Sequence, residues 1–367
     1  MFELLKYAGF CKSYFYAKLP TYLVLFVTAR CNFRCKMCFY WKNTETADKD
    51  KELSLNEISR ISRSFGRILN LAISGGEPFL RDDLDQICKV FYENNSLYSM
   101  NIPTNGSMPE RVEIATDSIL RTCKKAVVAV ELSLDGIGQG HDYIRGKEGS
   151  FENVQETYKR LCSLKRKYPH LWMTISTTFS SYNQSDMPEI IAYVTRKMPC
   201  DDFHISILHG NPRETQAQDV SWEKYMQALK LLEVSRSMTG KNLHSRLLLA
   251  LKKEVRKEII NIAKYGKMSS PCTAIKKLIV IDERGEVFPC ETIRETLGNL
   301  RDFDCDIKKV ILSRQRFAIE RQYKIGAGCK CHWVCAIFNN ILYDPRRVPG
   351  ILKKTFFPAN GNNRGVC

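Results

Sequence analysis

The sequence predicts an α/β fold built on a parallel sheet. Between residues 20 and 210, short apolar segments alternate six times with amphipathic segments. This alternation is typical of βα units joined by right-handed crossovers. Three of the expected strands are followed by the dipeptides Gly-Gly, Asn-Gly and Asp-Gly. In folds of this class the functional residues lie in the loops that follow the parallel strands. With 367 residues, 44% of them hydrophobic, the chain can bury a substantial core.

The individual elements follow from hydrophobic spacing. Residues 22–29 (YLVLFVTA) are apolar throughout and rich in β-branched and aromatic residues, which suits a strand buried on both faces. Residues 54–69 place apolar side chains at spacings of three and four, which predicts an amphipathic helix with Ser54 as its N-cap. The later strands are expected at residues 70–74, 97–103, 126–134, 172–179 and 203–208, and the later helices at 82–92, 110–123, 151–164 and 187–196.

After the sixth expected strand the pattern changes twice. Residues 221–265 are helical, and from Cys272 onward Cys, Gly and Pro punctuate short strands at 278–282 and 286–289. We therefore expect a helical connector followed by a small cysteine-rich module. The expected boundaries are an N-terminal extension at 1–20, a core at 21–215, a connector at 216–270, the module at 271–345 and a basic tail at 346–367.

Composition and charge limit the cellular compartment and the binding partners that we expect. The net charge of +16 attracts anions, but the basic residues are dispersed, which is more typical of a solvated surface than of a nucleic-acid groove, and we expect no nucleic-acid partner. We expect no signal peptide, and the longest apolar run is too short to span a bilayer. A cytoplasmic location follows as the expectation, and in a reducing compartment clustered cysteines act as metal or redox ligands.

A cysteine triplet directly follows the first expected strand. Cys31, Cys35 and Cys38 have the spacing Cx3Cx2C in the segment RCNFRCKMCFYW. Three thiolates in one loop can bind three irons of a 4Fe–4S cluster and leave the fourth iron open to another ligand. Zinc is the alternative on spacing alone, although structural zinc prefers four closed ligands and no fourth Cys or His is near in sequence.

The second expected strand ends in GGEP at residues 75–78. Together with the triplet, this segment resembles the radical S-adenosylmethionine (SAM) superfamily, whose Cx3Cx2C and GGEP motifs occur in this order. The resemblance implies a partial (β/α)6 TIM-like barrel. It also implies an enzyme that cleaves SAM reductively at the 4Fe–4S cluster and uses the 5′-deoxyadenosyl radical to abstract hydrogen from a substrate.

The resemblance also implies a SAM pocket at the strand ends. The two glycines would offer backbone oxygens to the SAM amino group, and Glu77 would accept from it or order the loop. Ser133 would hydrogen-bond the ribose or the carboxylate of SAM, Arg145 would pair with the carboxylate, and His141 is expected to be structural. Met37 stands where the family usually has an aromatic residue, so one of the neighbouring aromatics is expected to contact SAM instead. The SAM-binding candidates are Tyr40, Gly75, Gly76, Glu77, Thr104, Asn105, Ser133 and Arg145.

A second group of cysteines lies toward the C-terminus. Cys272, twelve residues, Gly285, four residues and Cys290 resemble the opening of the SPASM/twitch extensions found in radical SAM enzymes. A full SPASM module has seven cysteines for two clusters, whereas this region has fewer, so the resemblance implies one auxiliary 4Fe–4S cluster. Its candidate ligands are Cys272, Cys290, Cys329, Cys331 and Cys335. A zinc ribbon is the alternative.

The cofactor chemistry is better defined than the substrate, because function lies in the site and not in the fold. We expect a peptide or small-molecule substrate and an external electron donor such as flavodoxin or ferredoxin. One alternative is a lipid- or glycan-tailoring enzyme with peripheral membrane contact, suggested by the basic, aromatic N-terminus and the basic tail. Another is a non-catalytic iron–sulfur electron carrier, which would have no use for a SAM pocket. No catalytic acid or base is assigned, and His204 and His209 suit either a substrate contact or a structural role.

Overall fold

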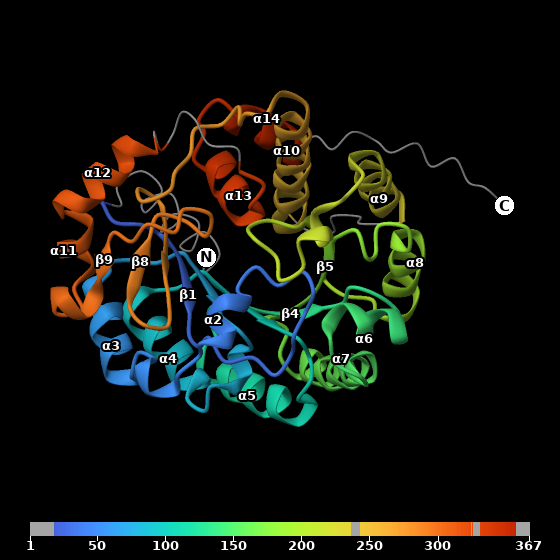
Figure 1. The fold of residues 1–367 in the computed structure, drawn as a ribbon, viewed down its shortest axis with the longest axis horizontal. Helices are drawn as coiled ribbons and strands as arrows, with labels where there is room; N and C mark the ends of the chain where they lie inside the picture. Colours follow the sequence, from blue (N-terminus) through green and yellow to red (C-terminus); the bar gives the residue numbers. More distant parts are fainter. Residues whose placement is uncertain (1–17, 236–242, 324, 326–330, 357–367) are drawn as a thin grey trace. The chain divides into compact units, whose positions relative to one another are not determined.

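The computed structural model describes residues 18–235, 243–323, 325 and 331–356 (Figure 1). The chain divides into two compact units. Unit 1 comprises Met1–Arg236 and Ala274–Gln322, and unit 2 comprises Ser237–Thr273 and Tyr323–Cys367. Each unit is therefore built from two stretches of sequence that are far apart along the chain.

Unit 1 contains one sheet with the strand order β6-β5-β4-β3-β2-β1-β7-β8-β9. The first six strands pair in parallel, each with the next along the chain, and the predicted α/β fold with a partial (β/α)6 barrel is confirmed. The strands are β1 (Tyr22–Phe26), β2 (Asn70–Ser74), β3 (Ser99–Thr104), β4 (Val127–Ser133), β5 (Leu171–Phe179), β6 (Asp202–Ile207), β7 (Leu278–Ile281), β8 (Glu286–Phe288) and β9 (Gly298–Asn299).

Helices connect these strands and lie outside them, as Figure 1 shows for α3, α4, α5 and α7. The barrel helices are α3 (Leu55–Ser64), α4 (Leu84–Asn95), α5 (Pro109–Thr122), α6 (Gln139–Arg145), α7 (Ser150–Lys167), α8 (Met187–Lys197) and α9 (Trp222–Ser235). Shorter elements are α2 (Trp41–Glu45), α11 (Ile307–Ile311), α12 (Arg314–Gln322) and the 3-10 helices η1 (Lys49–Lys51), η2 (Pro78–Leu80), η3 (Thr215–Gln218) and η4 (Leu300–Phe303).

The core of unit 1 lies between the sheet and these helices. In β4 the buried residues alternate with half-buried ones, as the period-two geometry of a strand requires. Val128, Val130 and Leu132 are buried on one face, while Glu131 and Ser133 on the opposite face are half-buried. One face of β4 therefore packs into the apolar core, and the opposite face presents polar side chains at the end of the strand.

The strand after Cys272 continues the barrel sheet. β7 pairs in parallel with β1, with Leu278 opposite Tyr22, and β8 then pairs antiparallel with β7. The segment that the sequence suggested as part of a separate module is thus the neighbour of the first barrel strand. It brings the residues that follow β7 to the same end of β1 from which the cysteine loop leaves.

Unit 2 is helical among its described residues. It contains α10 (Leu243–Tyr265), α13 (Val334–Leu342) and α14 (Val348–Phe356), and α10 packs against the other two. Arg347, just before α14, ion-pairs with Glu254 at 2.9 Å and Glu258 at 2.7 Å, both on α10. These buried carboxylates therefore fix α14 to α10.

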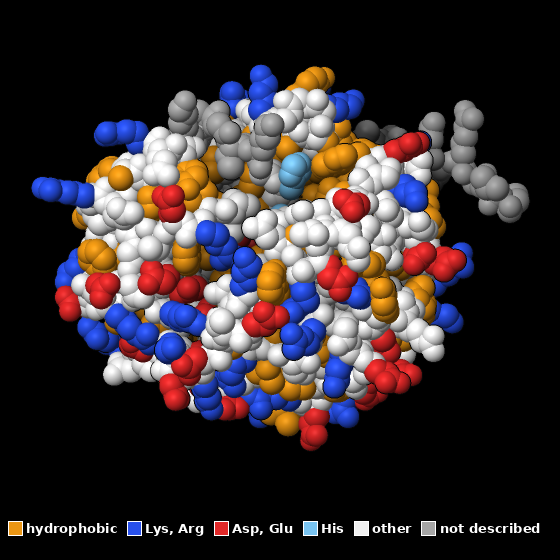
Figure 2. Space-filling view, in the orientation of Figure 1, with side chains coloured by type: hydrophobic (Ala, Val, Ile, Leu, Met, Phe, Trp, Pro, Cys, Tyr) orange, Lys and Arg blue, Asp and Glu red, His pale blue; other side chains and the backbone are white. Residues whose placement is uncertain are grey.

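The face of the protein shown in Figure 2 agrees with the dispersed charge expected from the sequence. Figure 2 shows Lys and Arg side chains scattered among Asp and Glu over the face in view, with no single-sign field. Within the part of the chain that is described, no helix has the length and apolar character needed to cross a membrane.

Candidate functional site

The loop after β1 presents the cysteine triplet. Cys31, Cys35 and Cys38 are half-buried within eight residues of chain. Burial raises the pKa of the Cys31 thiol to about 12 and that of Cys38 to about 11, while the backbone N–H groups of Phe33 and Tyr40 oppose the shift. Buried thiols of this kind become ligands when a positive metal centre compensates the thiolate charge. Three such thiols offered by one loop fit the 4Fe–4S cluster that the sequence predicted.

The two glycines of the GGEP segment are required by the chain itself. The φ angle of Gly75 is +141°, and a Cβ there would collide with the carbonyl oxygen of Thr28. A Cβ on Gly76 would lie 2.6 Å from the carbonyl oxygen of Ala29, while its N–H donates to the Thr28 oxygen at 2.8 Å. The turn after β2 therefore lies directly against the residues that lead into the cysteine loop.

Glu77 is buried and connects the ends of β2 and β3. Its carboxylate accepts from the Thr104 hydroxyl at 2.9 Å, the Asn105 N–H at 2.7 Å and the Phe79 N–H at 3.2 Å. Burial raises its pKa to about 7, against the lowering effect of these donors. Asn105 in turn donates to the side chain of Asn32, next to Cys31, at 2.8 Å. Of the two roles expected for Glu77, this geometry favours ordering the loop.

Arg145 reaches the cysteine loop from α6. Its guanidinium ion-pairs with the fully buried Asp135 at 2.5 Å, and its Nη1 lies 3.8 Å from the Sγ of Cys35. His141 is also fully buried, and its Nδ1 accepts from the Asp135 N–H at 3.1 Å. Burial lowers the pKa of His141 to about 3, so the ring is neutral and structural.

Two further SAM-binding candidates are placed differently. Ser133 ends β4 opposite Ser176 and is half-buried. Tyr40 is 2% exposed, its ring centroid lies 4.6 Å from that of Phe26, and its hydroxyl donates to Glu283 at 2.5 Å. Burial first, and then the charge of Glu283, raises the pKa of Tyr40. The hydroxyl of Tyr40 is thus occupied by a carboxylate that follows β7.

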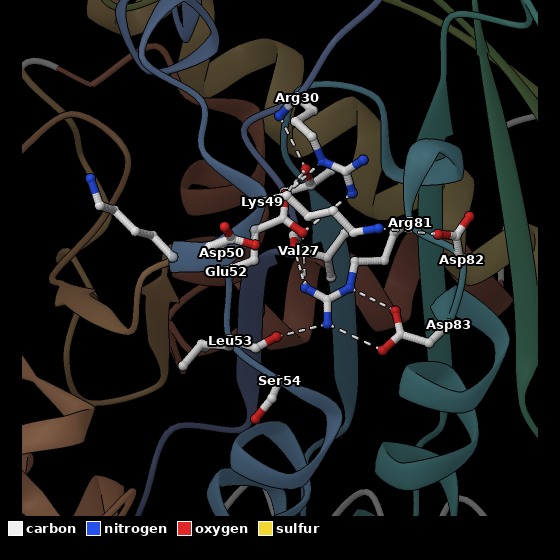
Figure 3. Close-up of polar contacts among 12 residues, drawn as sticks. Val27, Arg30, Lys49, Asp50, Glu52, Leu53, Ser54, Arg81, Asp82 and Asp83 are labelled. Atoms are coloured by element: carbon white, nitrogen blue, oxygen red, sulfur yellow. Dashed lines mark hydrogen bonds and ion pairs between the residues drawn. The ribbon is translucent and has the colours of Figure 1, made fainter.

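A carboxylate outside the sequence motifs, that of Glu52, supports the start of the cysteine loop. Glu52 accepts from the Thr28 hydroxyl, from the Arg30 Nε at 2.9 Å and from the Arg81 Nη1 at 3.4 Å. Figure 3 shows Glu52 between the two guanidinium groups, one preceding Cys31 and the other following the GGEP segment. Both motifs are therefore connected to one buried anion.

Arg81 completes this connection. It is 8% exposed, pairs with Asp83 at 2.7 Å, and donates to the main-chain oxygens of Val27 at 2.9 Å and Leu53 at 2.7 Å (Figure 3). A guanidinium in a rigid planar fork can satisfy several acceptors at once. The signal in the sequence was an Arg beside each motif, but nothing in the sequence names Glu52 as their common partner.

The two histidines that the sequence left open have acidic neighbours. The Nε2 of His209 lies 3.0 Å from a carboxylate oxygen of Glu291, and its ring centroid lies 4.7 Å from that of Phe39. The Nε2 of His204, on β6, lies 3.6 Å from Glu131. Both rings are therefore engaged by protein groups.

The C-terminal cysteines are divided between the two units. Cys290 is buried in unit 1, with its Sγ 3.1 Å from the Thr292 hydroxyl. Unit 2 contains buried Cys331 and half-buried Cys272 and Cys335, whereas Cys329 lies outside the described residues. Over the ranges that are described, no three His, Cys, Asp or Glu side chains converge on a position for a single metal ion.

Comparison with known proteins identifies the family. The family model described as "Radical SAM superfamily" matches residues 25–194, which include the cysteine triplet, the GGEP segment and Arg145. Residues 25–194 form a radical SAM domain. The family implies a 4Fe–4S cluster and SAM, and the residues described above fit both.

Curated relatives of this radical SAM chain are distant. An AdoMet-dependent heme synthase of Methanosarcina barkeri (strain Fusaro / DSM 804) is 24% identical over 300 residues, 77% of this chain and 80% of that protein. The Pre-heme d1 synthase of Dinoroseobacter shibae (strain DSM 16493 / NCIMB 14021 / DFL 12) is 27% identical over 217 residues, 56% of this chain and 48% of that protein. The chain thus spans about half the length of the latter relative.

Solved structures resemble the radical SAM chain over most of its length. Native anSMEcpe with bound AdoMet and Cp18Cys peptide gives a TM-score of 0.56 at 16% identity, covering 92% of this chain and 99% of that one. SuiB of Streptococcus suis bound to the precursor peptide SuiA gives a TM-score of 0.57 at 15% identity, covering 93% of this chain and 77% of that one. At these identities the likeness shows a shared fold.

Proposed function

We propose that this chain is a radical SAM enzyme in which Cys31, Cys35 and Cys38 bind the 4Fe–4S cluster and the neighbouring strand ends bind SAM. The observation that carries the proposal is the joining of the cysteine loop to the GGEP turn. Glu77 is hydrogen-bonded to Asn105, and Asn105 is hydrogen-bonded beside Cys31. When both are bound to the protein, the reduced cluster and SAM would supply the radical chemistry that abstracts a hydrogen atom from a substrate.

The residues of the chain bind, orient and enclose these groups. The thiolates hold three irons, and the tight approach of Gly75 and Gly76 to the start of the loop fixes its position. Buried Glu77 orders the ends of β2 and β3, and Arg145 supplies a buried positive charge beside Cys35. The apolar packing of Met37 against Ile144 and Ala217 helps to keep water from this end of the barrel.

The substrate we propose first is a peptide. The two solved structures that share the fold have peptides bound, and this supports a peptide. A small molecule is the second possibility, because curated relatives are named as heme-forming synthases. In either case an external one-electron donor such as flavodoxin or ferredoxin is required.

We also propose one auxiliary 4Fe–4S cluster. Its support is the sequence pattern, which places Cys290 at the expected distance from Cys272 and adds Cys329, Cys331 and Cys335. Four of these five thiols would complete a closed set of ligands. Such a cluster would accept an electron from the substrate or pass electrons outward.

The test is anaerobic reconstitution with iron and sulfide, followed by iron counting and a SAM-cleavage assay with dithionite. Wild type is compared with Cys35→Ala, Cys290→Ala and the control Cys162→Ala, whose thiol is half-buried on α7, outside the proposed ligand sets. About eight irons per chain, with half lost in each ligand variant and none in the control, is expected. SAM cleavage should disappear in Cys35→Ala.

Two results contradict parts of this proposal. Four irons in the wild type, all lost in Cys35→Ala and none in Cys290→Ala, would remove the auxiliary cluster and leave the radical SAM site. Full cluster content with no SAM cleavage, even with candidate peptides added, would favour the electron carrier instead of the enzyme.

A further inference from the structure

Arg145 contacts the sulfur of one cluster ligand. Its Nη1 lies 3.8 Å from the Sγ of Cys35, and the residue is 9% exposed. The thiols of Cys31 and Cys38, like that of Cys35, receive backbone N–H groups, in their case from Phe33 and Tyr40, but in the part of the chain that the structure describes no charged side chain donates to them. Among the described residues, Cys35 is therefore the ligand cysteine with a charged hydrogen-bond donor at its sulfur.

Asp135 holds Arg145 in this position. Its side chain is fully buried, one carboxylate oxygen accepts from the Thr178 N–H at 2.7 Å, and the other pairs with Arg145 at 2.5 Å. The main chain of Asp135 is fixed as well, because its N–H donates to His141 at 3.1 Å and its carbonyl oxygen accepts from Asn183 at 3.0 Å. With its main chain fixed, the carboxylate cannot turn away from Arg145 without also losing its hydrogen bond from the Thr178 N–H.

The guanidinium of Arg145 has enough N–H donors to contact the sulfur of Cys35 as well as the carboxylate of Asp135. Arginine carries five N–H donors, and the Nε of Arg145 is buried without a partner in the described structure. The positive charge of the guanidinium lies beside the sulfur, with Nη1 3.8 Å from the Sγ of Cys35. Arg145 therefore favours negative charge on this sulfur, and it stays protonated at any pH the protein meets.

We propose that Arg145 raises the reduction potential of the cluster that Cys35 helps to bind, through an N–H···S contact that Asp135 keeps in place. The inference rests on the proposed function. One-electron reduction by the external donor adds negative charge to the cluster and its sulfur ligands. A buried cation donating to one sulfur stabilises the reduced form more than the oxidised form, and hydrogen bonds to sulfur are a known control of cluster potential.

The experiment measures the potential and not the activity. Each protein is reconstituted with iron and sulfide in a Cys290→Ala background, so that an auxiliary cluster does not overlap, and is titrated potentiometrically without SAM while EPR follows the reduced cluster. The variants are Arg145→Gln and Arg145→Lys. The matched control is Arg34→Gln, which adjoins Cys35 but has a side chain 73% exposed and paired with Glu45.

In Arg145→Gln the ratio of reduced to oxidised cluster at a fixed potential should fall about tenfold, equal to a midpoint about 59 mV lower. Arg145→Lys should fall less, because it keeps the charge and loses the planar fork, and Arg34→Gln should not change. In an Asp135→Asn background, Arg145→Gln should change the ratio several-fold less, because Arg145 is no longer held at the sulfur.

Wild-type iron content with an unchanged ratio in Arg145→Gln would overturn the proposal, as would a change that occurs only after SAM is added. If Arg145→Gln does not hold the cluster, Arg145→Lys decides, and an unchanged ratio in it overturns the proposal equally. Failure of the parent protein to bind a cluster at Cys31, Cys35 and Cys38 would refute the proposed function instead, so the two failures are distinguishable.

Discussion

His141 shows how burial sets a protonation state beside the cysteine loop. Its ring is fully buried, its Nδ1 accepts from the Asp135 N–H, and its centroid lies 6.0 Å from that of Phe151. Desolvation disfavours the charged imidazolium, which is why the pKa falls to about 3. The residue keeps the turn after β4 in place only while it is neutral.

This protonation state predicts a pH dependence of stability. The folded-state pKa of about 3 lies below the ordinary value of 6.5, so the unfolded state binds the proton more readily. The stabilisation is complete above about pH 6.5 and is lost as the pH falls toward 3. Between pH 7 and pH 5 the cluster-free protein should lose about 2 kcal/mol from this residue.

The comparison is urea unfolding of the cluster-free wild type and His141→Asn at both pH values. The asparagine oxygen can accept the Asp135 N–H in place of Nδ1 but does not titrate. The variant should lack that share of the pH dependence. Equal losses in the two proteins would show that His141 does not titrate with unfolding.

Some residues of the site could be foreseen and others could not. Glu77, Thr104 and Asn105 were expected together because each ends one of two adjacent parallel strands, and the carboxyl ends of such strands meet at one edge. Tyr40 was expected near SAM, but its hydroxyl partner Glu283 lies 243 positions away along the chain. No local pattern indicates a pair so far apart.

At the scale of elements, the buried ion-pair network of Glu52 stabilises the loop after β1. Its side chain is 6% exposed, that of Arg81 is 7% exposed and that of Arg30 is 27% exposed. Removing Glu52 would leave Arg30 without its carboxylate and Arg81 with Asp83 as its remaining one, and breaking a buried ion pair costs up to about 3–5 kcal/mol. Glu52→Gln should therefore lower the free energy of unfolding, by about 3 kcal/mol, and reduce iron uptake by the loop.

The control for Glu52→Gln is Glu45→Gln. Glu45 follows the same loop and pairs with Arg34 and Arg213, but its side chain is 39% exposed. Solvent-exposed pairs contribute about 0–1 kcal/mol, so this variant should be nearly neutral. Similar losses in the two variants, measured by urea unfolding, would contradict a special role for the network around Glu52.

Helices and strands were predicted best where their hydrophobic pattern extends over many residues. The expected barrel strands match the observed ones to within a few residues at each end, and the helix expected at 54–69 ends at Ser64 because Phe65 is extended. The seven-residue helix α6 was not expected, because it is too short to show a period. It lies between Gly138 and Gly146, both at positive φ, and these two local backbone conformations set its ends.

At the scale of the whole molecule, the two units are predicted to unfold separately. In unit 2, Arg347→Met would leave Glu254 and Glu258, 8% and 2% exposed, without their guanidinium partner. A loss of about 3 kcal/mol is expected for this buried pair. Hydrogen exchange should speed up in α10 and α14 and stay unchanged in the strands β3 and β4 of unit 1.

The matched variant for Arg347→Met is Lys257→Met. Lys257 pairs with the same Glu254 at 3.2 Å, but its side chain is 60% exposed, so its removal should have little effect on exchange. If exchange in β3 and β4 also speeds up in Arg347→Met, the two units unfold together and the prediction is wrong.

The pairing of β7 with β1 has a consequence for shortened forms of the protein. A chain cut before Leu278 would keep all six strands of the barrel but would uncover one side of β1, where Leu23, Val24, Leu25 and Phe26 are all buried. An open hydrophobic edge strand is a template for pairing with other chains. The barrel expressed alone should therefore aggregate, and a version that stays dispersed should need a substitute strand, or charged residues, at that edge.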